Sequence, residues 1–173
     1  MAIGLSHGGS TLYSSPSPSQ EILVGTREGV VTIERETSGS EWRLKHRALT
    51  DKHISAIIKE PESGLTFAGA FHGSVHASAD DGKTWEPRNN GLTETDVYSL
   101  AARRVNGRVR LFAGTEPAHL FTSDDLGLHW SEVPSLRSVP SVPKWSFPRA
   151  PSRWTCKAYQ LRSRQPDDDV RCR

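Results

Sequence analysis

Two short stretches of this sequence carry carboxylates at a spacing that could bind a cation. The first is SADDGKTW, from Ser78 to Trp85, and the second is SDDLGLHW, from Ser123 to Trp130. A high-affinity calcium loop supplies about six or more oxygen ligands, and each stretch supplies too few. We therefore interpret both as hairpin turns, in which glycine permits a left-handed backbone and aspartate accepts hydrogen bonds from nearby amides.

Two other pairs of residues could carry chemistry. Asp51 and Asp96 are 45 residues apart and could serve as general acid and base in glycoside cleavage, where the separation of the two carboxyl groups decides the stereochemical outcome. His72 and His76 are four residues apart, as some metal ligands are. The sequence places no third ligand beside them, so we predict no metal site.

The two carboxylate stretches belong to a longer repeat. Trp85 and Trp130 are 45 residues apart, and so are Gly69 of LTFAGAFHGSVHASADDGKTW and Gly114 of LFAGTEPAHLFTSDDLGLHW. The apolar positions between the matched residues also correspond. Self-similarity at a period of about 45 residues is typical of propeller blades.

A third, degenerate copy lies upstream in ILVGTREGVVTIERETSGSEW. Its Gly25 precedes Gly69 by 44 residues, and its Trp42 precedes Trp85 by 43. The aspartates are lost from this copy, which keeps only Ser38 and Trp42 of the turn approximately.

Short apolar runs separated by Gly, Pro, Asn and Asp predict four strands in each complete copy, with no α-helix. The expected strands are 53–60, 65–71, 74–79 and 84–88, followed by 97–104, 110–115, 119–123 and 129–133. The fold class is therefore all-β: an incomplete β-propeller of about three four-stranded antiparallel blades. The predicted divisions are an N-terminal segment (1–20), three blades (21–50, 51–93 and 94–137) and a linker with an irregular tail (138–173).

The two turns resemble the S-x-D-x-G-x-x-W pattern of Asp-box (BNR) repeats, which occur in sialidase-like and related glycosyl hydrolase-like β-propellers. The matching residues, to which the resemblance gives a structural role, are Ser78, Asp80, Gly82, Trp85, Ser123, Asp125, Gly127 and Trp130. The resemblance implies a parent of six to eight blades that acts as a binding or scaffolding module. The alternative is a sialidase-like or xyloglucanase-like glycoside hydrolase, although the Phe/Tyr-Arg-Ile-Pro motif of true sialidases is missing.

The ligand, an unidentified protein or carbohydrate, is expected at the end of the blades opposite these turns. Up-and-down connections place the loops between strands two and three at that end, together with the links between blades. The candidate catalytic pair is Asp51 and Asp96. The candidate binding residues are Arg27, Glu28, His53, His72, Tyr98, Glu116 and His119.

Composition and charge limit the classes of partner that we expect this chain to bind. The formal net charge is +2, but residues 149–173 carry seven Lys and Arg against three Asp, a local charge of +4 that leaves the remainder at −2. No basic cluster suited to nucleic acid lies outside this stretch. No signal peptide or membrane span is evident, so we expect a cytoplasmic location, no membrane partner and no cofactor.

The strand pattern stops at residue 148. We interpret the remainder, which contains Cys156 and Cys172, as the product of a reading-frame shift that truncates a longer array; the alternative is a disordered basic tail. Three blades are too few to close a propeller. Open blade edges are therefore expected to drive self-association, and the truncation could leave the chain inactive.

Overall fold

The computed structural model describes residues 2–5 and 19–142, with side chains from residue 19 onward. The compact unit considered below spans Met1–Pro140. The predicted frame-shifted tail and both cysteines lie outside the described residues.

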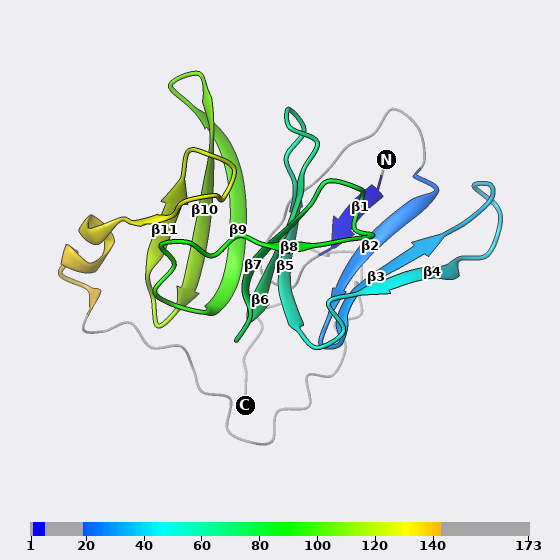
Figure 1. The fold of residues 1–173 in the computed structure, drawn as a ribbon, viewed down its shortest axis with the longest axis horizontal. Helices are drawn as coiled ribbons and strands as arrows, with labels where there is room; N and C mark the ends of the chain where they lie inside the picture. Colours follow the sequence, from blue (N-terminus) through cyan, green and yellow to red (C-terminus); the bar gives the residue numbers. More distant parts are fainter. Residues whose placement is uncertain (1, 6–18, 143–173) are drawn as a thin grey trace, which may run out of the picture. The chain divides into compact units, whose positions relative to one another are not determined.

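The described chain forms three four-stranded sheets, here called blades 1, 2 and 3 (Figure 1). Blade 1 comprises β1 (Ala2–Leu5), β2 (Glu21–Thr26), β3 (Gly29–Glu34) and β4 (Arg43–Ala48). Blade 2 comprises β5 (His53–Lys59), β6 (Thr66–Phe71), β7 (Ser74–Ser78) and β8 (Glu86–Pro87). Blade 3 comprises β9 (Asp96–Val105), β10 (Arg108–Glu116), β11 (Leu120–Ser123) and β12 (Ser131–Glu132). Strands follow chain order within each sheet, so the all-β, partial-propeller prediction is confirmed.

One strand departs from the prediction. The sequence analysis predicted antiparallel blades and placed no strand before residue 21, whereas β1 joins blade 1 and runs parallel to β2, with Ala2 opposite Glu21. A single four-residue strand carries no period, so no sequence pattern could reveal it. Beyond β12 the chain forms a short 3₁₀-helix, Pro134–Ser138, and the described residues contain no α-helix.

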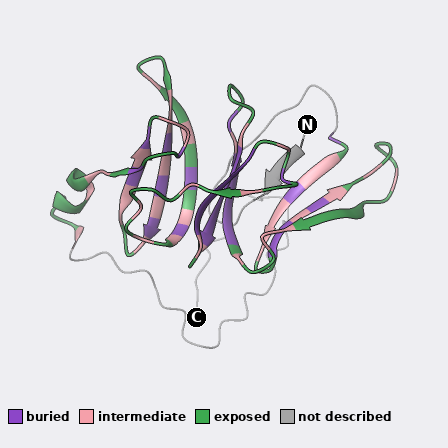
Figure 2. Ribbon diagram, in the orientation of Figure 1, coloured by how far each residue is buried: buried purple, intermediate pink, exposed green. Residues whose placement is uncertain are grey.

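Blade 2 is buried on both faces. Phe67 and Val75 belong to a cluster with Leu100, Leu111 and Phe121 of blade 3, whereas Ile54 and Ala68 belong to a second cluster with Leu23 and Val30 of blade 1. Figure 2 accordingly shows buried residues concentrated in β5, β6 and β7. Each sheet therefore removes its apolar area from water by packing against the next blade rather than around a core of its own.

The repeated glycines mark where neighbouring blades approach most closely. A methyl group at Gly25 would lie 2.9 Å from Ile54 Cγ2, and one at Gly69 would lie 2.8 Å from Val97 Cγ1. Ile54 and Val97 occupy the same place near the start of the first strand of the following blade. A side chain at these glycines would hold the blades apart, so the repeat keeps glycine for packing.

A hydrogen bond between blades reinforces this contact. The register of β5 on β6 shifts between Ile54 and Ala56, which leaves Ser55 in a β-bulge. The single proton of the buried Ser55 hydroxyl is shared between the carbonyl oxygen of Gly69, at 3.0 Å, and that of Val97 in blade 3. The bulge thus satisfies polar groups at the closest approach of blades 2 and 3.

The repeated tryptophans cover the preceding blade. Trp130 is 4% exposed in the cluster between blades 2 and 3, and its Nε1 donates to Arg88 O at 2.8 Å. Trp85 packs on the cluster between blades 1 and 2. Trp42, in the first blade, is 37% exposed and is covered by the Arg35 guanidinium, 4.6 Å from the ring centroid.

We expect Gly69→Ala to lower the free energy of unfolding by about 1–3 kcal/mol, because the new methyl group overlaps buried Val97 and Leu100. Gly39→Ala is the matched control, since nothing lies within 4 Å of its added Cβ. Urea unfolding of both variants measures the difference. Equal effects of the two substitutions would contradict close approach of blades 2 and 3.

Candidate functional site

The turn between β7 and β8 is built on two short polar side chains. Ser78 Oγ donates to Asp80 Oδ1 at 2.8 Å and accepts from Gly82 N at 2.8 Å. Asp80 Oδ1 also accepts from Lys83 N and Thr84 N, at 3.0 and 2.8 Å. Gly82 has a φ of +87°, a left-handed backbone conformation that glycine adopts without steric cost. The hydrogen bonds of Ser78 and Asp80 therefore stabilise the turn itself.

The turn between β11 and β12 repeats the same bonds. Ser123 Oγ donates to Asp125 Oδ1 at 2.7 Å and accepts from Gly127 N at 2.8 Å, and Asp125 Oδ1 accepts from His129 N at 2.9 Å. Among the described residues, no group of three or more His, Cys, Asp or Glu side chains is placed to hold a metal ion. The geometry fits the structural role expected from the sequence.

Hydrogen bonds keep both aspartates ionised at low pH. Backbone and hydroxyl bonds from Thr84 dominate at Asp80 and lower its pKa to about 2. Partial burial would raise the pKa of Asp125, but the bonds from His129 and Ser123 outweigh it, and that pKa is also about 2.

The predicted ligand-binding end brings several candidates together. His72 lies in the turn between β6 and β7, and Asp96 starts β9 of the next blade. His72 Nδ1 is 2.7 Å from Asp96 Oδ1, and the same oxygen accepts from His72 N at 2.9 Å. The backbone at Ser74 N donates to Thr95 O at 2.9 Å. The strand two-to-three turn of one blade therefore lies against the link into the next.

Aromatic rings gather around Phe71, next to this His72–Asp96 pair. Phe71 lies 3.8 Å from the His72 ring, 5.5 Å from Tyr98 and 5.9 Å from His53, measured between centroids. The register shift between Gly114 and Thr115 places a β-bulge at Tyr98, matching the bulge at Ser55. We call His53, Phe71, His72, Asp96 and Tyr98 the aromatic cluster.

Desolvation and nearby acids act on Tyr98. Burial, followed by the charges of Glu116 and Asp96, raises the pKa of its hydroxyl above the ordinary value. Glu116 therefore lies close enough to the aromatic cluster for its charge to act on the Tyr98 hydroxyl. At neutral pH the Tyr98 hydroxyl remains a hydrogen-bond donor as well as an acceptor.

Asp51 lies in the link between blades 1 and 2. Its Oδ2 is 2.6 Å from Lys52 Nζ, and this bond, more than any other interaction, lowers the pKa of Asp51. Lys52 O accepts from Gly29 N at 2.8 Å, which ties the link to the turn after β2. Asp51 and Asp96 thus each have a basic partner of their own, and their joint action in catalysis stays a prediction.

The remaining candidates are spread more widely. Arg27 and Glu28 are exposed in the turn between β2 and β3. The His119 side chain is only 11% exposed; its Nδ1 is 2.8 Å from Glu132 Oε1, and its ring stacks on Phe121. His119 is thus held within its own blade.

His76 does not join His72. It lies inside β7, 8% exposed, and its Nδ1 has no hydrogen-bond partner among the described residues. Burial, followed by the positive charge of Lys52, lowers its pKa, so the ring is neutral at pH 7. His76 occupies the place that Phe121 takes in blade 3, opposite the corresponding alanine of the neighbouring strand. Its position indicates packing rather than metal binding.

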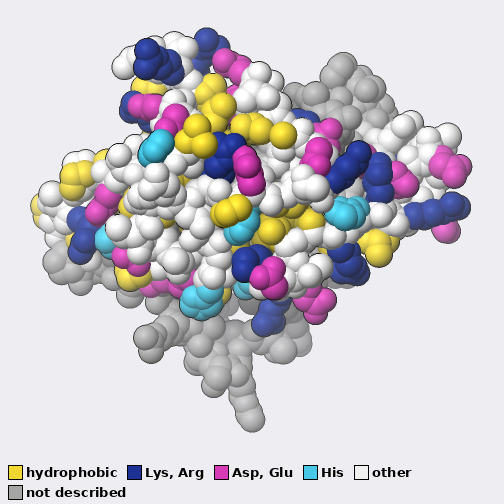
Figure 3. All heavy atoms as spheres, viewed as in Figure 1, with side chains coloured by type: hydrophobic (Ala, Val, Ile, Leu, Met, Phe, Trp, Pro, Cys, Tyr) yellow, Lys and Arg dark blue, Asp and Glu magenta, His cyan; other side chains and the backbone are white. Residues whose placement is uncertain are grey.

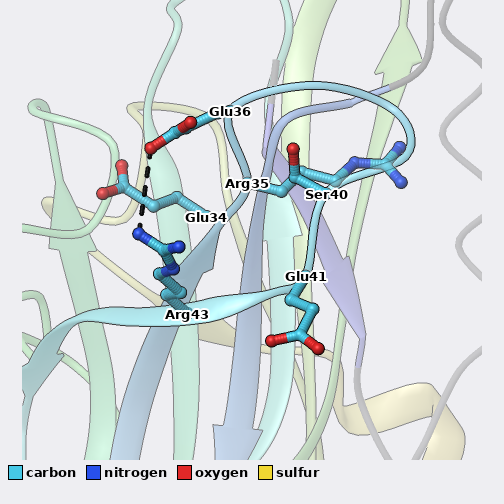
Figure 4. Close-up of a pocket in the computed structure, with 6 residues that line it drawn as sticks. All are labelled: Glu34, Arg35, Glu36, Ser40, Glu41 and Arg43. Carbon is cyan, nitrogen blue, oxygen red and sulfur yellow. Dashed lines mark ion pairs between the residues drawn. The ribbon is translucent and has the colours of Figure 1, made fainter.

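A pocket of 210 Å³ lies elsewhere, at the loop between β3 and β4 (Figure 4). Glu36 Oε1 and Arg43 Nη1 are 3.8 Å apart. Figure 4 shows these two side chains facing one another, with the Arg35 side chain directed to the far side of the loop. Glu36 and Arg43 are mostly exposed, and exposed ion pairs contribute little to stability. The lining residues, none predicted as a site, are Glu34, Arg35, Glu36, Ser40, Glu41 and Arg43.

The surface around the blades is of mixed character. Figure 3 shows acidic, basic and histidine side chains interspersed over the visible face, with hydrophobic side chains between them.

The sequence analysis missed one member of the aromatic cluster, Phe71. Its signal was positional: it ends β6 immediately before the turn that carries His72.

No family model matches this chain, and no curated protein matches it at a significant level. In the part of the chain that the structure describes, no helix is both long enough and apolar enough to cross a bilayer.

Acidification should remove the stabilisation supplied by the two turn aspartates. Their folded pKa of about 2 lies below the ordinary value of 3.8, so each carboxylate stabilises the fold above pH 3.8, and the contribution disappears as pH falls towards 2. Asp80→Asn and Asp125→Asn should therefore be less stable than the wild type at pH 7, with a gap that narrows across this range. Urea unfolding at several pH values measures the gap, and a gap independent of pH would contradict this role.

Proposed function

We propose that this chain is a ligand-binding module whose binding surface is the aromatic cluster. The observation that carries the proposal is the convergence of Phe71 from blade 2 with Asp96 and Tyr98 from blade 3 at one end of the blades. A partly exposed apolar surface with a few fixed polar groups is the usual composition of a binding site.

The chemistry of the cluster favours a carbohydrate. Aromatic faces offer apolar contact area, and the Tyr98 hydroxyl and Asp96 carboxylate offer a donor and acceptors for sugar hydroxyls. Asp96 is held by His72, and Tyr98 by a β-bulge and by Phe71, so little side-chain freedom is left to lose on binding.

Support for the wider family comes from the two aspartate turns. We propose that the chain is related to the Asp-box repeat propellers, because Ser78 and Ser123, with their aspartates two residues later, make the same hydrogen bonds. In such folds the site is argued from its own residues rather than from the architecture.

A glycoside hydrolase is the second candidate, through Asp51 and Asp96. A hydrolase of this kind needs one carboxylic acid with a raised pKa to protonate the leaving group. The Lys52 partner lowers the pKa of Asp51, which suits a base or a nucleophile but not that acid. We place binding before hydrolysis because the observation behind it, the contact of Phe71 with Tyr98 across two blades, requires no such acid.

An oligosaccharide array probed with the labelled 173-residue chain tests the binding proposal. Tyr98→Ala should weaken binding of any captured glycan about 10-fold or more, since it removes an aromatic contact and a hydrogen bond. Asp96→Asn should weaken it by less.

Asp124→Asn is the matched control, because Asp124 also pairs with a basic side chain, Arg110, but lies away from the cluster. Glycan capture that survives Tyr98→Ala and Asp96→Asn unchanged would contradict the proposed surface. Hydrolysis of aryl glycosides that is abolished by Asp51→Asn and Asp96→Asn would instead establish the hydrolase.

A further inference from the structure

We propose that the outer face of blade 3 binds blade 1 of a second copy of this chain, and that two copies close a six-bladed ring. The interface would repeat one part of the packing already present twice within one copy, namely the contact between the second and third strands of one blade and the turn tryptophan of the next. The argument rests on equivalent positions in the three blades.

Three positions form the face that each blade offers to the next one. In blade 1 they are Leu23, Gly25 and Val30; in blade 2, Phe67, Gly69 and Val75; in blade 3, Phe112, Gly114 and Leu120. Register fixes the equivalence, since each glycine is paired with the third member of its set.

The first two sets are covered and the third is not. Leu23, Val30, Phe67 and Val75 are at most 2% exposed. Phe112 and Leu120, by contrast, are only partly buried.

The third glycine is not filled by another blade either. An added methyl group at Gly114 would lie 2.6 Å from the Ser99 hydroxyl oxygen of its own sheet, whereas at Gly25 and Gly69 it would meet the next blade. Blade 3 therefore carries two partly buried apolar residues beside Gly114 and Ser99 and, among the described residues, no blade that covers them.

The turns before β8 and β12 show which contacts a blade packed on blade 3 would make. Gly82 of blade 2 lies against Leu23 of blade 1, and Gly127 of blade 3 lies against Phe67 of blade 2. Trp85 and Trp130 pack beside these contacts. Phe112 occupies the position of Leu23 and Phe67, so a turn with a tryptophan from a following blade would cover it in the same way.

Blade 1 offers such a surface, and no other sheet of the described residues packs on that side of it. Trp42 occupies the tryptophan position and is 37% exposed, with only the Arg35 guanidinium of its own blade over its ring. Val24 and Val31 are paired in the register that Ala113 and Phe121 have in blade 3, where those two residues pack on blade 2. The exposed Trp42, together with Val24 and Val31, is therefore the counterpart of the buried face of blade 3.

The number of blades in a closed propeller favours a ring of two copies. The described residues contain three sheets, and known propellers close with about four to eight blades. Two copies supply six, whereas three copies would supply nine. A head-to-tail interface of this kind forms a closed ring when the rotation between subunits permits it.

Sedimentation velocity of the 173-residue chain at micromolar concentration tests the proposal. We expect a species of about twice the 19.1 kDa chain mass. Phe112→Glu and Trp42→Glu should each convert it to the monomer, because each places a charge in one side of the interface. Leu128→Glu is the control, since Leu128 is 51% exposed on a turn, and this variant should stay dimeric.

Mixing the two monomeric variants distinguishes the arrangement. One copy then retains its blade 3 face and the other its blade 1 face, so a two-chain species should reappear, with weaker affinity because only one interface forms. Circular dichroism melts of the variants establish that each is folded. A monomeric wild type, a dimer that Trp42→Glu leaves intact, or a polymer that grows with concentration would overturn the proposal.

Discussion

Close approach between neighbouring sheets is the constraint on which the rest of the structure depends. At Gly25 and Gly69 the space that a side chain would fill is taken by Ile54 and Val97 of the following blade. Large apolar residues on either side of each glycine then lose their contact with water. Both clusters of buried apolar residues lie between sheets, so stability is a property of pairs of blades.

The aspartate turns serve that packing from the periphery. Their hydroxyl and carboxylate groups satisfy the backbone donors of a tight turn, which leaves the glycine of each turn free to lie against the preceding blade. The aromatic cluster depends on the same packing, because Phe71 and Tyr98 come from different blades. A change in the spacing between blades 2 and 3 would therefore alter the cluster and the stability together.

Much of this could be read from the sequence because each signal is repeated. The matched glycines and tryptophans fixed the blade period, and short apolar runs fixed the strands of blades 2 and 3 nearly to the residue. The parallel β1 has no counterpart in the other blades and could not be found in this way. The reasoning that puts His72 and Asp96 at the same end of the blades looked for polar loop residues, so it passed over Phe71, whose only signal is its place at the end of a strand beside that turn.

The sequence also could not distinguish residues that lie in corresponding loops of two blades but bind different partners. His119 and His72 occupy similar places in their blades, yet His119 is bound to Glu132 within blade 3 and His72 to Asp96 of the next blade. The difference depends on which acidic residue lies within reach, and only the three-dimensional arrangement supplies that. His76 is a similar case, because burial rather than spacing decides that it packs as a neutral ring.

The central claim, that the glycine of one blade receives the β-branched residue of the next, is tested most directly by nuclear Overhauser effects. With methyl labelling of Ile and Val, we expect cross-peaks from the Gly25 Hα protons to the Ile54 methyl group and from the Gly69 Hα protons to the Val97 methyl groups. Their absence, in spectra that still show the cross-strand contacts within each sheet, would contradict the account.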